Sequence, residues 1–147
     1  MSGVLEGIRV LDFGRYIAGP FCAALLADLG AEVIRIERLG GGEDRPFIPV
    51  GAGPEGGGAM FLAMNRNKLG MTLDPAAPQG REIVRKLVAT ADVVVANLPP
   101  RVLRSLALDL DSLRATKPDI ILTTVTGFGS GGPLSRVSTV STASARQ

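Results

Sequence analysis

The sequence has no histidine, no tryptophan and a single cysteine. Without histidine, the chain cannot assemble a Ser-His-Asp or Cys-His catalytic arrangement, or a zinc site with imidazole ligands. The single thiol, Cys22, cannot form an internal disulfide or a CxxC site. Because Cys22 lies in an apolar segment, we expect it to pack in the interior.

Excess charge of one sign and long apolar runs are also absent. The formal net charge is +2, the basic residues are scattered, and aromatics make up 4% of the chain. A nucleic-acid groove or base-stacking platform is therefore not expected. No apolar run is long enough for a membrane span, and the first residues lack the features of a signal peptide. We expect no membrane partner, no nucleic-acid partner and a cytoplasmic location.

The residues that are present favour one α/β domain. The chain has 147 residues, of which 46% are hydrophobic, and this suits a sheet covered on both faces. Apolar runs at residues 8–13 and 32–36 predict buried parallel strands. Between them, Gly19-Pro20 predicts a helix that begins at Pro20 and ends at Gly30. Its small-residue face is expected to contain Ala23, Ala24, Leu26, Ala27 and Leu29.

Further strands and helices alternate along the rest of the chain. Residues 39–58 are rich in Gly and Pro and predict a mobile loop. Ile83, Val84, Leu87 and Val88 are expected to form the buried face of the next helix. The predicted elements are strands 67–73, 92–96 and 120–126 and helices 78–90, 100–106 and 110–116. This order predicts an α/β fold, a Rossmann-like parallel sheet with flanking helices.

A ligand is expected at one edge of this sheet. Strand, helix and parallel strand form a right-handed crossover, and ligands in such sheets bind outside the carboxyl ends of the strands. Residues 14–18 and 37–38 occupy those positions here. A phosphorylated small molecule would suit the nearby basic residues. These residues are Arg35, Arg38, Arg45, Arg66 and Lys68.

A glycine-rich segment at residues 127–132 satisfies the GxGxxG pattern of dinucleotide-binding proteins. The pattern follows a late strand, and Pro133 comes directly after it with no amphipathic helix. A true fingerprint lies in the first strand-to-helix turn of the fold. We therefore interpret the segment as a flexible turn; an unrelated nucleotide-binding domain would instead require it to hold phosphate.

Several longer motifs occur in a fixed order. They are residues 5–12 (Leu-Glu-Gly-Ile-Arg-Val-Leu-Asp), 19–20 (Gly-Pro), 28–38 (Asp-Leu-Gly-Ala-Glu-Val-Ile-Arg-Ile-Glu-Arg), 65–68 (Asn-Arg-Asn-Lys), 72–74 (Thr-Leu-Asp), 80–82 (Gly-Arg-Glu), 91–97 (Ala-Asp-Val-Val-Val-Ala-Asn), 117–118 (Lys-Pro) and 127–129 (Gly-Phe-Gly). In order and spacing, these motifs resemble the family III CoA-transferases, a family that includes the alpha-methylacyl-CoA racemases. The resemblance covers residues from about 4 to 133.

The resemblance implies a function and a binding site. Members of the family move coenzyme A between carboxylic acids, or epimerise the carbon beside a CoA thioester. They need no metal or prosthetic group, form interlocked homodimers, and bind CoA or acyl-CoA in the first domain. The positions that match that site are Ile17, Ala18, Arg38, Leu73, Asp74, Pro75, Ala76, Asn97, Leu98 and Pro99.

Four of the candidate positions leave alternatives open. Arg38 either meets a phosphate or forms a surface ion pair with Glu37 or Glu43. Tyr16 either lines the site or packs. Leu98 stands where the family usually has an aromatic residue. Arg104 is displaced by one position from the family's phosphate-binding arginine, which turns it by about 100° on a helix.

The largest departure from the family is at the end of the chain. The resemblance places a catalytic aspartate about a dozen residues after the Gly-Phe-Gly segment, but residues 134–147 contain no acid, and six of them are Ser or Thr. We expect an incomplete CoA-binding domain over residues 1–133 and a disordered or frame-shifted tail over residues 134–147. The alternative is a genuine short paralogue with a polar tail. Asp12 and Asp28 are expected to have structural roles.

Function then divides into two hypotheses. In the first, the chain is the N-terminal part of a CoA-transferase or racemase, and is catalytic only if another chain supplies the missing half. In the second, it is a noncatalytic remnant that binds CoA or forms dimers. On either hypothesis the chain alone is expected to be inactive.

Overall fold

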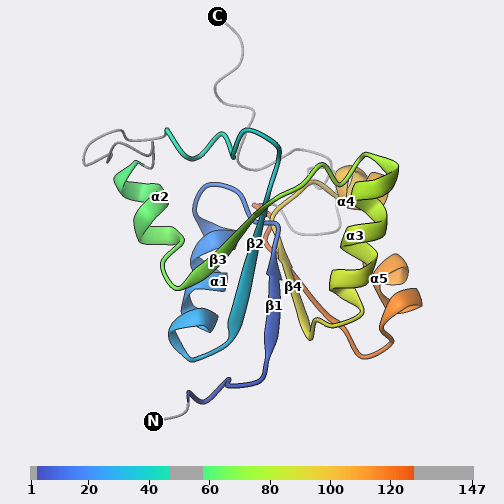
Figure 1. The fold of residues 1–147 in the computed structure, drawn as a ribbon, viewed down its shortest axis with the longest axis horizontal. Helices are drawn as coiled ribbons and strands as arrows, with labels where there is room; N and C mark the ends of the chain where they lie inside the picture. Colours follow the sequence, from blue (N-terminus) through green and yellow to red (C-terminus); the bar gives the residue numbers. More distant parts are fainter. Residues whose placement is uncertain (1–2, 47–57, 128–147) are drawn as a thin grey trace, which may run out of the picture.

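The computed structural model describes residues 3–46 and 58–127, which form one sheet with helices on both faces (Figure 1). The strands are β1 (Arg9–Asp12), β2 (Glu32–Glu37), β3 (Lys68–Thr72), β4 (Val93–Ala96) and β5 (Ile121–Thr124). The helices are α1 (Ala18–Asp28), α2 (Ala59–Met64), α3 (Pro78–Val88), α4 (Pro100–Ser105) and α5 (Leu110–Thr116).

The sheet is parallel throughout and has the order β3-β2-β1-β4-β5. Val10 of β1 pairs with Val33 of β2 on one side and Val93 of β4 on the other. The chain therefore leaves β1 toward one edge of the sheet and later returns to add β4 on its other side. This topology confirms the predicted Rossmann-like α/β class.

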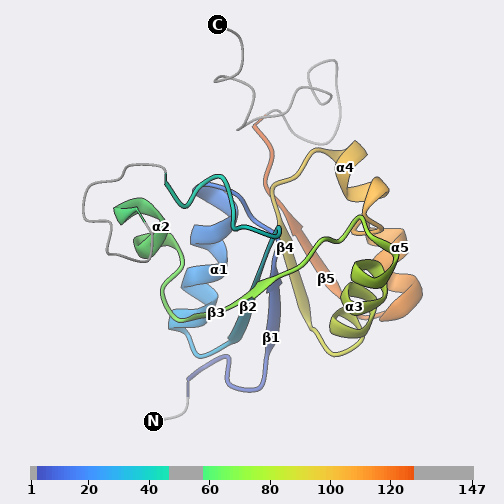
Figure 2. The same ribbon diagram turned by 45° about the horizontal axis from the view of Figure 1, so that its top comes forward.

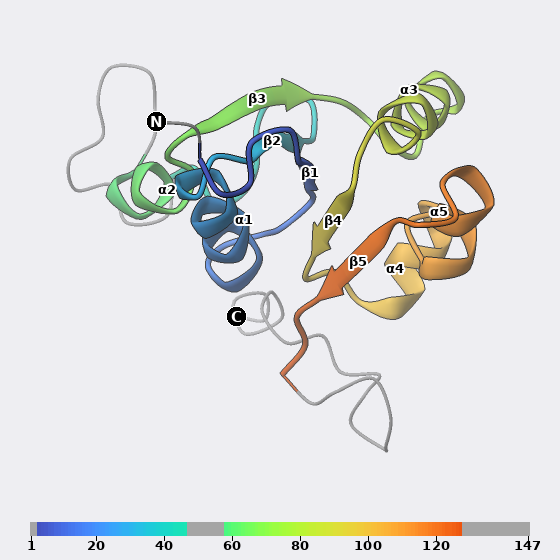
Figure 3. The ribbon, with the colours of Figure 1, turned by 90° about the horizontal axis from the view of Figure 1, so that it is seen from below.

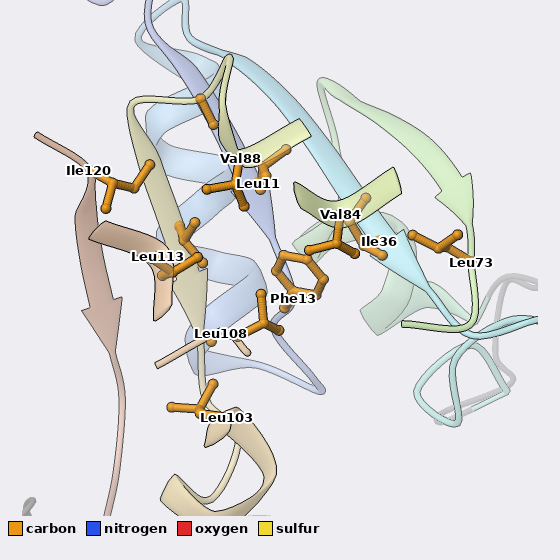
Figure 4. Close-up of a cluster of buried hydrophobic side chains, with 13 residues drawn as sticks. Leu11, Phe13, Ile36, Leu73, Val84, Val88, Leu103, Leu108, Leu113 and Ile120 are labelled. Atoms are coloured by element: carbon orange, nitrogen blue, oxygen red, sulfur yellow. The ribbon is translucent and has the colours of Figure 1, made fainter. Parts of the chain in front are cut away.

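Two hydrophobic clusters cover the two faces of the sheet. On the first face, α1 contributes small residues, and α2 lies beside it (Figure 3). On the second face, α3, α4 and α5 pack over larger side chains (Figure 4). The buried members on the first face are Val10, Ala23, Ala27, Ala31, Val33 and Val95. Those on the second include Leu11, Phe13, Ile36, Val84, Val88, Leu103, Leu108, Leu113 and Ile120.

Helix α1 begins at Ala18, two residues before the predicted start, so Pro20 lies in its first turn. A proline is tolerated there because its missing N–H would have no intrahelical partner. Of the residues predicted to form the small-residue face, Ala23, Ala24 and Ala27 are buried, whereas Leu29 is 48% exposed. Leu29 is the C-cap residue and lies outside the regular helix.

Helix α3 begins at Pro78 as predicted. Val84 and Val88 are buried, whereas Ile83 is 37% exposed, so its predicted burial is wrong. The buried stripe instead continues to Gly80 at a helical spacing of four. A Cβ at Gly80 would lie 1.8 Å from the Asp74 carbonyl oxygen, so only glycine allows this approach of helix and loop.

Helix α2 was not predicted from the sequence. It is a six-residue helix of apolar residues with good helix propensity, and Phe61 is its buried member. Helix α5 begins at Leu110 and is capped by Asp109, whose carboxylate accepts a hydrogen bond from the Ser112 amide at 3.2 Å. This cap also lowers the pKa of Asp109, mainly through the hydrogen bond from the Ser112 side chain.

Several predictions lie outside the described residues. They concern most of the loop predicted at 39–58, the glycine-rich turn at 127–132, the domain boundary at 133 and the tail at 134–147. Within the described part of the chain, no helix is long and apolar enough to cross a membrane.

Candidate functional site

The loops that follow the strands gather at the carboxyl edge of the sheet (Figure 2). After β1 the chain crosses to one face as α1, and after β4 it crosses to the other face as α4 (Figures 1 and 3). Adjacent parallel strands whose connections leave in opposite directions form a crevice, and this crevice is the usual ligand position in such folds. The candidate site is therefore the edge between the loops after β1 and β4.

Asn97 joins these two loops. Its side-chain oxygen accepts from the Arg15 amide at 2.7 Å, and its side-chain nitrogen donates to the Arg15 carbonyl at 2.8 Å. Gly19 leaves room for this contact, since a Cβ there would lie 3.2 Å from Asn97 Oδ1 and 2.9 Å from Gly14 Cα. The amide group of Asn97 is thus used within the protein, where it fixes the loop after β1.

A cluster of buried charges lies beneath this edge. We call it the buried charge cluster; it consists of the buried residues Asp12, Arg35, Glu37, Asp44 and Lys68 and the half-buried Arg45. Its three carboxylates and three cations balance formally. Burial of a charge is tolerated only when it is paired and hydrogen-bonded, and this cluster meets that condition through side chains from β1, β2, β3 and the loop after β2.

Asp12 and Lys68 form one end of the cluster. Asp12 Oδ1 accepts from the Gly14 amide at 2.7 Å, and Asp12 Oδ2 accepts from Lys68 Nζ at 2.8 Å. Lys68 Nζ also donates to the Pro20 carbonyl and to Asn65 Oδ1. Burial lowers the pKa of Lys68, and Asp12 partly opposes this shift. These contacts confirm the structural role expected of Asp12, which orients the loop after β1.

Arg35 forms the centre of the cluster. Its Nε donates to Glu37 Oε1 at 2.8 Å, its Nη2 donates to Asp44 Oδ2 at 2.6 Å, and its Nη1 lies 3.7 Å from Asp12 Oδ2. Burial opposes the charge on Arg35, but the hydrogen bond and the neighbouring carboxylates outweigh it and raise the pKa of Arg35. A guanidinium with this many anionic partners is held in one orientation.

Glu37 connects the strand end to the next turn. Its Oε2 accepts from Arg45 Nε at 2.6 Å and from the Gly42 amide at 3.1 Å. Burial alone would raise the pKa of Glu37, but the hydrogen bonds from Arg45, Arg35 and Gly42 hold it below its usual value. Arg45 also lies over the ring of Phe61 at 4.4 Å, which ties α2 to the same turn.

The charge cluster corrects part of the prediction from sequence. Arg35 and Lys68 are buried in ion pairs, so they do not meet a phosphorylated molecule. Arg66 pairs with Asp28 at 2.5 Å, and this pair confirms the structural role expected of Asp28. Arg38 alone among the five predicted cations is mostly exposed, with 64% of its side chain accessible.

Arg38 lines a shallow pocket of about 570 Å³ at the carboxyl edge. Its Nε donates to the Gly41 carbonyl at 3.0 Å and lies 3.8 Å from Glu43 Oε2. The ion pair with Glu43 that was one alternative for Arg38 is therefore present, yet the guanidinium remains open to solvent. The other residues around the pocket are Gly40, Gly41, Gly42, Glu43, Arg45, Pro46 and Thr72.

The other predicted site residues of the first loop lie beside the crevice. Ile17 and Ala18 are exposed at the start of α1. Tyr16 is partly exposed and has a left-handed backbone, with φ +59°. Burial, followed by the charges of Glu43 and Asp44, raises the pKa of Tyr16.

The segment after β3 is placed by its backbone. The side chain of Leu73 is buried in the hydrophobic core. Its backbone amide donates to the Glu37 carbonyl at 2.7 Å, which fixes the start of this segment. Asp74 is exposed, and its side chain accepts from the Ala76 amide in a local turn. Pro75 is partly exposed and Ala76 is exposed between this turn and α3.

The segment after β4 contributes the last candidates. Leu98 and Pro99 are half-buried between β4 and α4, and Arg104 is exposed in the last turn of α4. Arg81 of α3 links the two segments, since it donates to the Ala76 carbonyl and to the Ser105 carbonyl. The structure thus brings all predicted segments to one edge, but no contact joins Arg104 to Arg38 among the described residues.

The sequence did not reveal Asp44 as a site residue, and it included Arg15 only as a member of the segment 14–18. Asp44 is fully buried and accepts from the Tyr16 amide at 3.2 Å, while Arg15 Nη1 donates to the Ile36 and Gly14 carbonyls. Both lie in irregular loops, where no periodicity marks a residue as buried. The only available signal for Asp44 was its place in the loop directly after Arg38.

A second pocket, of about 270 Å³, lies between α3 and α5. Its floor includes Val84, Val88 and Leu113. Its charged neighbours Arg85 and Glu82 are paired with each other, and Arg81 donates to the Ser105 carbonyl. Cys22, on the opposite face, is half-buried and packs against the first-face cluster as expected, and burial raises the pKa of its thiol.

Comparison with known proteins agrees with this geometry. A family model described as CoA-transferase family III matches residues 5–144. A succinate–glutarate CoA-transferase of Agrobacterium fabrum is 41% identical over 134 residues, which cover 88% of this chain and 34% of the relative. The human succinyl-CoA:glutarate CoA-transferase is 40% identical, and 90% of this chain and 30% of the relative are covered.

A solved structure gives the same result. A CAIB/BAIF family protein from Brucella suis superposes with a TM-score of 0.89 at 39% identity, over 95% of this chain and 37% of that protein. The chain therefore spans about a third of the length of the relatives it matches. Because the family match extends over nearly the whole sequence and the chain superposes closely on a solved relative, the chain belongs to CoA-transferase family III.

Proposed function

We propose that this chain binds coenzyme A or an acyl-CoA thioester at the carboxyl edge of its sheet, as the CoA-binding part of a family III CoA-transferase. The observation that carries the proposal is the exposed guanidinium of Arg38 beside the 570 Å³ pocket. A guanidinium fork suits the oxygens of a pyrophosphate. The ion pair of Arg38 with Glu43 is long, at 3.8 Å, and therefore leaves the guanidinium able to bind a ligand.

The neighbouring loops support the same ligand. Ile17 and Ala18 are exposed beside the crevice, and their backbone groups suit the polar edges of a nucleotide or a pantetheine amide. Leu98 and Pro99 add half-buried apolar surface on the other side of the crevice. The relatives named as succinyl-CoA:glutarate CoA-transferases act on an acyl-CoA and a dicarboxylic acid, and substrates of that class are proposed here.

We propose further that the chain binds CoA without exchanging thioesters by itself. Transfer through an enzyme-bound acyl group needs a carboxylate that is free to attack. Asp12, Glu37 and Asp44 are all engaged in ion pairs beneath the candidate site. At the surface of the site, Glu43 lies 3.8 Å from Arg38 and Asp74 accepts a hydrogen bond from the Ala76 amide. The sequence after residue 127 contains neither Asp nor Glu, so it offers no other carboxylate side chain.

Calorimetry with CoA tests the proposal. The wild-type chain is expected to bind CoA, and Arg38→Ala is expected to weaken binding by at least about tenfold, as for loss of a charged hydrogen bond. Arg66→Ala is the matched control, because Arg66 is also partly exposed and paired with a carboxylate but lies away from the pocket. A thioester-exchange assay on the same sample is expected to show no turnover. Absence of CoA binding by folded protein would overturn the proposal.

A further inference from the structure

Two loops of the proposed CoA site meet at one carboxylate, Asp44. It lies on the loop after β2, which also carries Arg38. Its Oδ2 nevertheless reaches across to the loop after β1, where it accepts from the Tyr16 amide at 3.2 Å. The same oxygen accepts from Arg35 Nη2 at 2.6 Å, so the contact is anchored to the strand between the two loops.

The loop after β1 needs such support at Tyr16. The backbone of Tyr16 has φ +59°, a conformation that costs a residue with a side chain about 1 kcal/mol or more. Surrounding contacts must therefore hold Tyr16 in place. Because Ile17 and Ala18 follow directly, the backbone geometry at Tyr16 sets the position of the exposed groups that the proposed site uses.

The loop after β2 is fixed at two points by the same cluster. Glu37 holds the Gly42 amide at 3.1 Å, and Asp44 is held by Arg35 two residues later. Between β2 and these anchors lies the turn in which Arg38 donates to the Gly41 carbonyl. The position of the Arg38 guanidinium over the pocket therefore depends on the anchors at Gly42 and Asp44.

Stability alone does not account for a carboxylate at position 44. Asp44 Oδ1 is buried and has no hydrogen-bond partner among the described residues, which is costly for an acceptor. Buried ion pairs in general contribute little net stability compared with well-packed apolar residues. The carboxylate does, however, satisfy an amide of one loop and a cation of a neighbouring strand at once.

We propose that Asp44 is a positioning residue that holds the loop after β1 and the loop carrying Arg38 in one fixed arrangement for CoA binding. This inference rests on the proposed function. It assigns no contact between Asp44 and the ligand, because the carboxylate is fully buried. Asp44 acts on affinity only through Tyr16, Arg35 and the turn of Arg38.

A double-mutant cycle tests this role. We expect Asp44→Asn and Arg38→Ala each to raise the Kd for CoA about tenfold, and the double variant to raise it by clearly less than the product of the two. The proposal would be overturned if the double variant raised the Kd by the full product of the two single factors. It would also be overturned if Asp44→Asn left the Kd unchanged. Asp28→Asn is the control, since it removes a carboxylate of an exposed pair that is not part of the cluster and should leave the Kd unchanged.

A second readout does not depend on CoA. Hydrogen exchange of the Tyr16 amide should be protected in the wild-type chain and at least about tenfold faster in Asp44→Asn, because the accepted hydrogen bond is weakened. Equal protection in both proteins would contradict the role of Asp44. If the wild-type chain binds no CoA, the proposed function fails, and the exchange experiment still decides whether Asp44 holds the loop. Asp44→Glu, which keeps the charge and moves it outward, is the second variant if Asp44→Asn does not fold, and it is expected to show the same faster exchange.

Discussion

The carboxyl edge of the sheet is held in two different ways on its two sides. Around β1, β2 and β3, the loops are fixed by the buried charge cluster, in which Arg35 contacts three carboxylates. Around β4 and β5, the segment carrying α4 and α5 is held by buried Leu103, Leu108 and Leu113. Charge fixes the loops on one side, and apolar burial fixes the helices on the other.

The difference follows from the backbone on each side. The loops after β1 and β2 are irregular, so their amides at Gly14, Tyr16 and Gly42 are satisfied by carboxylates. The chain after β4 enters α4 within a few residues, and its amides are satisfied within helices and turns. Hydrogen bonds to side-chain carboxylates therefore fix the loops after β1 and β2, which carry the exposed groups of the proposed site.

The largest effect is expected from breaking the charged side. Asp12→Ala leaves the buried cations Lys68 and Arg35 short of a partner, and should lower the free energy of unfolding by about 3–5 kcal/mol. Urea titration of both proteins measures the loss. The control, Asp28→Asn in the exposed pair with Arg66, should cost less than about 1 kcal/mol. If both variants lost the same free energy of unfolding, burial of the Asp12 ion pairs would add nothing to their effect on stability.

A cavity on the apolar side should cost somewhat less. Leu113→Ala removes the buried side chain of α5 and should lower the free energy of unfolding by about 3 kcal/mol. Because Leu113 touches no charge of the cluster, the loss should be the same at low and high salt. A loss that depends strongly on salt concentration would contradict the proposed separation of the two sides.

Acid should weaken the charged side selectively. The pKa of Glu37 is held below its ordinary value, so its contribution to stability is complete above the unfolded pKa, about 4.3 for a glutamate. That contribution is lost as the pH falls through the lower folded pKa. Urea titrations between about pH 6 and pH 3 should therefore show a steeper fall in the wild-type chain than in Glu37→Gln. Identical slopes would mean that Glu37 is not stabilised by its partners.

The smallest effect is expected on the apolar side, and it is the one substitution of this set that should increase stability. Ala107 follows α4 and has φ +55°, a conformation that favours glycine. Ala107→Gly should raise the free energy of unfolding by up to about 1 kcal/mol, since the strain it relieves exceeds the added flexibility of the unfolded chain. Thermal unfolding of the two proteins provides the measurement, and a destabilised variant would contradict the prediction.

Much of the fold could be predicted because it depends on local pattern. The apolar runs at β1, β2 and β4 and the proline starts of α3 and α4 placed these elements within one or two residues of their observed bounds. Helix α2 was missed because six apolar residues beside a glycine-rich segment carry no clear period. Ile83 was misplaced because Gly80, which has no side chain, occupies part of the buried face of α3.

The site could be predicted only as a set of segments. The topology brought the loops after β1, β2, β3 and β4 to one edge, as expected for a parallel sheet. The sequence could not separate Arg35 from Arg38, because both are arginines at the end of one strand. Contacts with Asp12, Glu37 and Asp44 hold the first in the interior, and the turn after the strand exposes the second.

Chemical-shift mapping of the amides while CoA is added tests the location of the proposed site most directly. We expect shifts in the segments 14–18, 38–46, 72–76 and 97–104, with Gly41 and Gly42 among the largest because they line the pocket with Arg38. Shifts confined to the pocket between α3 and α5, or no shifts in folded protein, would contradict CoA binding at the carboxyl edge.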